Sequence, residues 1–108
     1  MAGREFLGEL EEMVLLAALR LRDDAYGASI LRELDERAGR DVPRGSVYVA
    51  IERLASKGFI TTSAGASSPK RRGRPRRMIR VTEAGLAAVR RSHEVRERLR
   101  HGTRALAP

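Results

Sequence analysis

Apolar residues recur at helical spacing from the start of the chain. Leu10, Val14, Ala17 and Leu21 fall on one side of a predicted helix over residues 5–21, and other leucines and alanines fill the neighbouring strip. This helix is apolar around most of its circumference, so it has to be covered on two sides. Its own domain can cover one side, and a second chain is the simplest cover for the other.

Two shorter helices are predicted next, separated by a turn that contains Pro and Gly. The second helix is expected over residues 25–38, where Asp23 and Asp24 offer N-cap carboxylates and Gly39 supplies a left-handed end. Pro43 fits the start of a third helix, because its missing N–H costs nothing in the first turn. This helix is expected to run to about residue 57, where Gly58 stops it.

The third helix has a buried side and a polar side. Val47, Ile51 and Leu54 form its predicted apolar stripe. The opposite face carries Ser46, Val49, Glu52, Arg53 and Ser56, with Tyr48 on the flank. A helix, a short turn and a second helix with a polar, partly cationic outer face are typical of a helix-turn-helix.

Two β-branched segments follow, and then the helical spacing returns. Residues 59–64 and 78–82 predict the strands of a hairpin, and the Gly-, Ser- and Pro-rich residues 65–77 predict the loop between them. Thr82 has the chemistry of an N-cap for a last helix over 83–100. A second stripe on that helix has the spacing of a short coiled-coil seam and consists of Ala88, Ser92, Val95 and Leu99.

The order of these elements predicts a mainly α fold with a small β-hairpin. It is the order of a winged helix-turn-helix, and the apolar stripes on its first and last helices hint at a second chain there. Residues 1–82 are expected to form the DNA-binding domain with the first helix, and residues 83–108 the C-terminal dimerisation helix and a frayed tail. Two stripes on the terminal helix again indicate one face for the domain and one for a partner.

Composition narrows the class of protein. The 108 residues suit one domain with a modest core, and because only 4% are aromatic that core must be aliphatic. There is no cysteine, which excludes disulfides, thiolate zinc sites and cysteine nucleophiles and fits a cytoplasmic protein. The longest apolar run, residues 13–19, is too short for a membrane span and too closely bounded by charge for a signal peptide.

The charged residues are distributed unevenly along the chain. The net charge is +8, and residues 1–69 carry 9 basic and 11 acidic side chains. Residues 70–81 carry 7 basic side chains and no acidic one, and residues 82–108 carry 6 basic and 3 acidic ones. Nearly the whole excess therefore lies in the twelve residues 70–81, most of which belong to the predicted loop of the hairpin. Such a concentration indicates a polyanionic partner, and with this fold the partner expected is double-stranded DNA.

Four stretches of the sequence resemble the PadR family of bacterial transcriptional regulators. They read LGELEEMVLLAAL, AYGASILRELDE, RGSVYVAIERLASKGFI and GRPRRMIRVTEAGL, and the resemblance covers about residues 6–90. Two departures from the family pattern are Met78-Ile79, where an aromatic pair is common, and Ser46, where threonine is usual. The short length after the hairpin is similar to the compact branch of the family, which has a single C-terminal helix.

The resemblance implies a homodimer that represses transcription, with the first and last helices at the interface. Some relatives bind aromatic effectors between protomers, and the lack of Trp argues against an aromatic-lined pocket here, so any small-molecule effector stays unidentified. The resemblance implies no cofactor. The residues expected at the dimer interface are Leu7, Leu10, Val14, Leu15, Ala88, Ser92, Val95 and Leu99.

The third helix and the hairpin supply most of the residues expected to contact DNA. A hydroxyl near the helix start can bind phosphate or base edges, Val49 can meet a thymine methyl, and Arg53 can reach guanine or phosphate. Tyr48 either joins them or packs with its hydroxyl tied to the hairpin. Tyr26 and Gly27 either hold a phosphate at the start of the second helix or serve in packing. The full set is Tyr26, Gly27, Arg44, Gly45, Ser46, Tyr48, Val49, Arg53, Lys70, Arg71, Arg72, Gly73, Arg74, Arg76 and Arg77.

The loop residues Arg72-Gly73-Arg74-Pro75 match the core of the AT-hook, a short peptide that binds the minor groove of DNA. An extended Arg-Gly-Arg fits a groove about 6 Å wide because Gly73 has no side chain to collide, and arginine gains from the negative potential of A·T tracts. The alternatives are phosphate contacts without sequence preference, or a nuclear-localisation signal, which the surrounding fold disfavours.

The sequence contains no recognisable set of catalytic or metal-binding residues. The two histidines, His93 and His101, lack cysteine or carboxylate partners at metal-ligand spacing, so no metal site is expected. No Ser-His-Asp set or phosphate-binding glycine loop is present, which indicates that the protein is not an enzyme. Two alternatives to an operator-binding regulator stay open: an architectural protein that binds A·T-rich DNA, and a winged-helix module that binds another protein.

Overall fold

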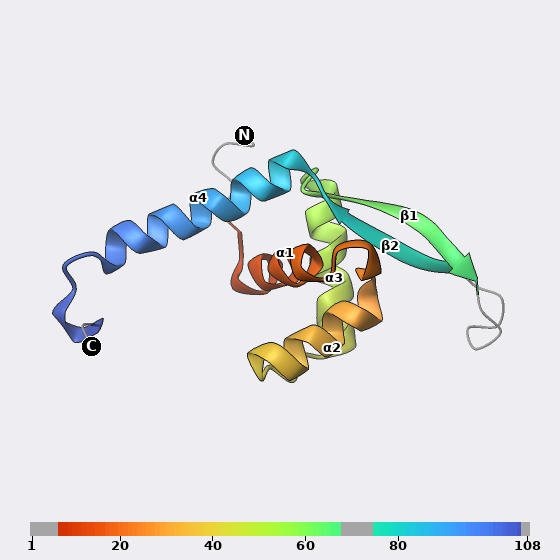
Figure 1. Cartoon of the computed structure of the whole chain (residues 1–108), viewed down its shortest axis with the longest axis horizontal. Helices are drawn as coiled ribbons and strands as arrows, with labels where there is room; N and C mark the ends of the chain where they lie inside the picture. The colour runs from red at the N-terminus through yellow and green to blue at the C-terminus, as the bar shows by residue number, and fades with distance from the viewer. Residues whose placement is uncertain (1–6, 68–74, 107–108) are drawn as a thin grey trace.

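The computed structural model describes residues 7–67 and 75–106 of the chain. Three helices, α1 (Glu9–Leu21), α2 (Gly27–Ala38) and α3 (Arg44–Ser56), form a central body. The antiparallel hairpin of β1 (Ile60–Ser67) and β2 (Pro75–Val81) projects from one side of this body, and α4 (Glu83–Arg100) projects from the other (Figure 1). The predicted order of elements, mainly α with one β-hairpin, is confirmed.

The first helix begins at Glu9, so the predicted start at residue 5 is wrong. Leu7 and Gly8 precede the helix, and Gly8 is extended, with φ −68° and ψ 162°. The Gly8 N–H donates a hydrogen bond of 2.8 Å to the Glu11 carboxylate, which satisfies a backbone donor at the helix start. The apolar pattern missed this boundary because Phe6 and Leu7 continue the helical spacing.

The second helix also starts later than predicted, and Asp23 and Asp24 do not cap it. They belong to a short 3-10 helix, η2 (Arg22–Asp24), and the N-cap of α2 is Tyr26. The buried hydroxyl of Ser29 organises this start, because it accepts from the Tyr26 N–H at 3.0 Å and donates to the Asp24 carbonyl at 2.7 Å. The predicted end is confirmed: Gly39 is left-handed, with φ 63°.

The third helix matches its prediction closely. Pro43 is the N-cap, and the helix ends at Ser56 before Gly58, whose φ of 78° only glycine adopts easily. Val47, Ile51 and Leu54 are buried, as the apolar stripe predicted. With α1 and α2 they build an aliphatic core, in which the largest fully buried side chains are Leu15, Ile30, Leu54, Val14 and Val47.

Both strands extend beyond their predicted bounds toward the connection between them. Ala64 pairs with Arg77 and Ser67 with Pro75, so Arg76 and Arg77 belong to β2 and not to a loop. Gly65 allows this pairing, because an added Cβ would lie 2.8 Å from the Met78 side chain. We call β1, β2 and residues 68–74 between them the wing.

The last helix runs over Glu83–Arg100, as predicted, and Thr82 caps it. The Thr82 hydroxyl accepts from the Gly85 N–H at 3.1 Å and donates to the Gly58 carbonyl at 2.7 Å, which joins α4 to the end of α3. Gly85 lies so close to the Phe59 carbonyl that an added Cβ would be 2.2 Å from its oxygen. In the tail, Arg104–Leu106 form a short 3-10 helix, η4, where fraying was expected.

Three residues expected at a dimer interface lie in the core of the single chain. Val14 and Leu15 are fully buried and Ala88 is 4% exposed, so they have almost no surface left for a partner. The sequence pattern gave no way to assign the sides of an all-round apolar helix. Leu7, Leu10 and Ser92 are half-buried, and Val95 and Leu99 are exposed.

Candidate nucleic-acid interface

The outer face of α3 is a continuous accessible surface. Tyr48 and Val49 are 46% and 48% exposed, so both side chains are accessible to a partner. Arg44, Gly45 and Arg53 are also exposed, and Ser46 is half-buried at the start of the helix. The helix therefore presents a hydroxyl, a methyl-bearing side chain and two guanidinium groups along one side, which is the set of groups that can contact base edges and phosphates.

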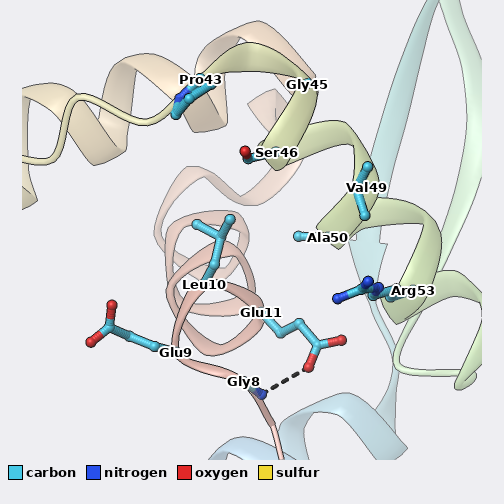
Figure 2. A pocket seen from close by; sticks show the side chains of 10 residues that line it. All are labelled: Gly8, Glu9, Leu10, Glu11, Pro43, Gly45, Ser46, Val49, Ala50 and Arg53. Carbon is cyan, nitrogen blue, oxygen red and sulfur yellow. Dashed lines mark hydrogen bonds between the residues drawn. The ribbon is translucent and has the colours of Figure 1, made fainter.

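One edge of this face borders a groove against the start of α1. The groove has a volume of about 750 Å³. Figure 2 shows Leu10 and Glu11 extending from α1, and Val49, Ala50 and Arg53 from α3, into the same space. Its lining residues are Gly8, Glu9, Leu10, Glu11, Pro43, Gly45, Ser46, Val49, Ala50 and Arg53.

The acidic residues beside this groove are neutralised by cations from other elements. Arg40, from the turn after α2, bonds to Glu9 at 3.0 Å, and Lys57, just after α3, bonds to Glu11 at 3.0 Å. Burial raises the pKa of Glu11, but the hydrogen bonds from Gly8 and Lys57 and the charges of Lys57 and Arg53 together hold this pKa below its ordinary value. Glu11 is therefore ionised and paired, which reduces its attraction for the Arg53 guanidinium.

Arg40 and Lys57 were not among the residues expected at the interface. A signal was present in the sequence: three acidic residues, Glu9, Glu11 and Glu12, stand close together beside a surface expected to meet a polyanion. Such a cluster requires basic partners, but the partners lie 31 and 46 positions away along the chain. Only the folded chain identifies them.

The other edge of α3 faces the wing. A small cavity there is lined by Gly27, Tyr48, Ile51, Glu52, Ala55, Thr62, Arg77 and Ile79. The Tyr48 ring covers Gly27 so closely that a Cβ on Gly27 would lie 2.7 Å from the ring and its hydroxyl. Gly27 thus permits the close approach of α2 and α3, and Tyr48 combines packing on this edge with an exposed outer surface.

Arg77 shares this cavity with Tyr48 and donates a hydrogen bond of 3.2 Å to the Thr62 hydroxyl. Thr62 is a polar neighbour of the α3 face that the sequence reasoning missed, because it was assigned only to a β-branched strand. Glu52 lies at the same edge, and it forms no ion pair with any residue in the described parts of the chain.

Tyr26 lies outside the α3 face, where the wing meets the start of α2. The Arg76 guanidinium lies over its ring, 4.3 Å from the centroid. The Tyr26 backbone is paired with Met78 of β2, and the Ile79 N–H donates to the neighbouring Ala25 carbonyl at 2.8 Å. Of the remaining wing residues expected to contact DNA, Lys70, Arg71, Arg72, Gly73 and Arg74 lie outside the described residues.

Neither a membrane span nor a metal cluster is found in the described residues. No helix there combines the length and the apolar character needed to cross a bilayer. Across residues 7–67 and 75–106, no three His, Asp or Glu side chains lie close enough together to hold a metal ion.

Several solved structures have a similar fold, and they include regulators of the PadR family. A PadR family transcription regulator from Clostridium difficile R20291 is similar over 86% of this chain and 92% of its own, with 20% identity and a TM-score of 0.69. A PadR family transcriptional regulator from Eggerthella lenta DSM 2243 is similar over 87% and 81%, with 26% identity and a TM-score of 0.69.

A third similar structure is Bacillus subtilis PadR, which was crystallised in complex with operator DNA. It matches with 20% identity and a TM-score of 0.62, and the similarity covers 76% of this chain but 46% of that longer one. At such identities the likeness shows the winged helix-turn-helix fold. No curated protein sequence gives a match to this chain.

The sequence itself matches the model of the transcriptional regulator PadR-like family over residues 15–91. This match spans the second half of α1, the whole helix-turn-helix, the wing and the first half of α4. The family consists of transcriptional regulators, which agrees with the expectation that the chain is not an enzyme. The chain therefore belongs to the PadR-like family of transcriptional regulators.

Proposed function

We propose that this protein is a homodimeric repressor that binds a pseudo-palindromic DNA operator. One observation carries the proposal: the accessible face of α3 and the basic wing are adjacent in a single chain, on either side of the small cavity that Tyr48 and Arg77 both line. A similar protein, Bacillus subtilis PadR, is known in complex with operator DNA. We infer that this chain uses the corresponding surface.

In this proposal α3 enters the major groove. Ser46, Val49 and Arg53 read bases from the edge beside α1, and Tyr48 contacts the backbone from the edge beside the wing. Arg44 and Gly45 lie at the start of the helix, where free N–H groups attract phosphate, and Gly27 sets the spacing between α2 and α3. The neutralised acids at the start of α1 keep that side of the surface from repelling DNA.

The wing contributes attraction that does not depend on sequence. Arg77 is exposed on β2, and the proposal assigns phosphate contacts to it and to the basic residues between the strands. The Arg72-Gly73-Arg74-Pro75 motif is proposed to enter the adjacent minor groove, on the basis of its sequence alone.

A second copy is proposed to pack against the terminal helices, with residues 83–108 as the main dimerisation element. Beyond Ser92, α4 carries Val95 and Leu99, which are 37% and 75% exposed, and α1 carries Leu16, which is 44% exposed. Leu16 borders a groove of about 370 Å³ between α1 and α2, lined also by Met13, Ala17 and Leu34. The proposal assigns these exposed apolar side chains to the contact with the second copy. Leu7, Leu10 and Ser92 complete the proposed contact.

Binding selection with purified protein tests the proposal. We expect DNA fragments selected from a random pool to share an inverted repeat, with half-site centres about 34–36 Å apart. Arg53→Ala should change which fragments are selected. Enrichment of A·T-rich fragments without a repeat would support the architectural alternative, and failure to retain any duplex at low salt would support a protein-binding module.

A further inference from the structure

The two described wing arginines point to opposite faces of the hairpin. Side chains alternate along a strand, so Arg77 lies on the same face as Ile79, which is 5% exposed and packs into the core. That face also borders Tyr48 of α3. Arg76 lies on the other face with Met78, whose backbone pairs with Tyr26. The register therefore separates Arg76 from the α3 surface and directs it toward the start of α2.

Arg76 is engaged within the chain and is half-buried. Its guanidinium lies 4.3 Å from the Tyr26 ring centroid, within the distance at which a cation is attracted to an aromatic face. Its Nε atom is buried and has no hydrogen-bond partner among the described residues. Stacking occupies only the face of the guanidinium, so what limits phosphate binding is the buried Nε–H, which cannot supply one of the two bonds of a bidentate contact.

The stacked pair is the outermost attachment of the wing to the body among the described residues. The root of the wing is held by the buried side chains Ile60 and Ile79, by the hydrogen bond between the Ile79 N–H and the Ala25 carbonyl, and by the pairing of Met78 with Tyr26. Arg76 stands three residues beyond Ile79 along β2, or roughly 10 Å at the usual strand rise. An attachment further from the root restricts the bending of a two-stranded ribbon more than further contacts at the root do. Isolated hairpins are marginal in stability, so such outside support matters.

We propose that Arg76 is a positioning residue, which stacks on Tyr26 to fix the direction of the wing relative to α3 and does not itself bind DNA phosphate. This inference rests on the proposed DNA-binding function. It assigns Tyr26 the same role, in place of a direct phosphate contact. The described strands of the wing then approach the duplex from one fixed direction.

The salt dependence of DNA binding tests whether the stacked pair supports the phosphate contacts of the wing. Each phosphate contact contributes about 0.9 to the slope of log affinity against log salt. Tyr26→Leu removes no charge, yet we expect it to weaken binding to a mixed-sequence duplex about fivefold to tenfold and to lower the slope by about one contact or more. Arg76→Leu should act alike, and the double variant should lose little more than either single one.

Tyr26→Phe and Arg77→Leu are the matched controls. Tyr26→Phe keeps the ring and should bind as the parent does, whereas Arg77→Leu should lose its own contact and add to the effect of Tyr26→Leu. The inference is overturned if Tyr26→Leu keeps the parent slope, or if Tyr26→Phe is as weak as Tyr26→Leu. Thermal melting of each variant verifies that it is folded.

A second measurement works without DNA. The chain has no cysteine, so Ala28→Cys and Ala64→Cys, both at exposed positions, place one spin label on α2 and one on β1. The labelled protein is mixed with an excess of unlabelled protein, so that a dimer contains at most one labelled chain. The distance measured between the two spin labels is then the distance within one chain. Arg76→Leu should broaden its distribution, and an unchanged distribution overturns the inference. A parent protein that binds no duplex contradicts the proposed function alone, because the label distance still tests the role of the stacked pair.

Discussion

The wing and α4 both project from the three-helix body, but they are attached in different ways. The wing places Ile60 and Ile79 in the core, and its second strand is hydrogen bonded to the segment before α2. The first half of α4 likewise contributes Ala88 and Val89. Its next contacts are polar: Ser92 and Arg96 both bond to Glu12 of α1, and beyond them Leu99 is 75% exposed.

This difference indicates which of the two projections has its apolar side chains covered within a single chain. The root of the wing has its apolar residues covered and its outer face held by the Tyr26–Arg76 pair. In the second half of α4, Val95 is 37% and Leu99 is 75% exposed, so the described residues leave part of its apolar stripe uncovered. A helix with one uncovered apolar stripe gains stability from a partner. We therefore expect changes at the wing to act on DNA binding, and changes along α4 to act on self-association.

The largest expected effect comes from removing the exposed apolar surface of α4. Burying one leucine contributes about 1.5–3 kcal/mol, and a homodimer contains two copies. We expect Leu99→Ser to raise the dimer dissociation constant by about 100-fold or more, as measured by analytical ultracentrifugation. Val49→Ser is the control, because Val49 is also an exposed aliphatic residue but lies on α3. Equal dissociation constants for Leu99→Ser and the parent would contradict the proposed interface.

The next largest effect concerns the junction that both projections share. Gly85→Ala would place a Cβ 2.2 Å from the Phe59 carbonyl oxygen, between the start of α4 and the root of the wing. The backbone has to move, and we expect a loss of about 3 kcal/mol in the free energy of unfolding, measured with urea. Gly45→Ala on α3 is the control, because an added Cβ there meets no atom within 4 Å. A loss no greater than that of the control would be inconsistent with this close approach.

A smaller effect is expected where α4 makes its polar contact with the body. Glu12 is 7% exposed and bonds to both Ser92 and Arg96. Glu12→Ala leaves these partners without an acceptor, and we expect a loss of about 1–2 kcal/mol in the free energy of unfolding. Glu9→Ala removes an exposed ion pair with Arg40 and should cost about 0.5 kcal/mol or less. If Glu12→Ala and Glu9→Ala unfold at the same urea concentration, the buried contact of Glu12 contributes no more to stability than the exposed ion pair of Glu9.

The smallest expected effect is a change in pH dependence at the start of α1. The pKa of Glu11 is lower in the folded chain than in an unfolded one, so the folded state binds fewer protons. The resulting stability is present above the ordinary pKa of a glutamate and is lost as the pH falls through the lowered value. Glu11→Gln should therefore lose less stability than the parent between about pH 6 and pH 3. If the free energy of unfolding falls equally with pH in Glu11→Gln and in the parent, Glu11 does not contribute to the pH dependence of stability.

The sequence predicted those elements whose signals are local. Gly39, Pro43, Gly58 and Thr82 mark helix ends because of their own backbone or side-chain chemistry, and each stands where it was expected. The start of α2 was predicted wrongly because two aspartates offered caps, while Ser29, three residues into the segment, supplies the hydroxyl that organises it. Local preference cannot decide between competing caps.

Predictions that depend on packing between distant segments succeeded only in part. The outer face of α3 was predicted because one helix has one buried side. The positions of Arg76 and Arg77 were not, since Pro, Gly and Arg disfavour strands and pairing across the hairpin overrides that preference. The sides of α1 could not be assigned either, so Val14 and Leu15 were placed at an interface although the core buries them.

The hydroxyl group of Thr82 bonds at once to Gly58, two residues beyond the end of α3, and to the first turn of α4. In the proposed dimer, a rotation of α4 would therefore reach the end of α3 through this one hydroxyl, without rearranging the aliphatic interior. A signal that altered how two subunits meet would then change the spacing of the paired helices on an operator.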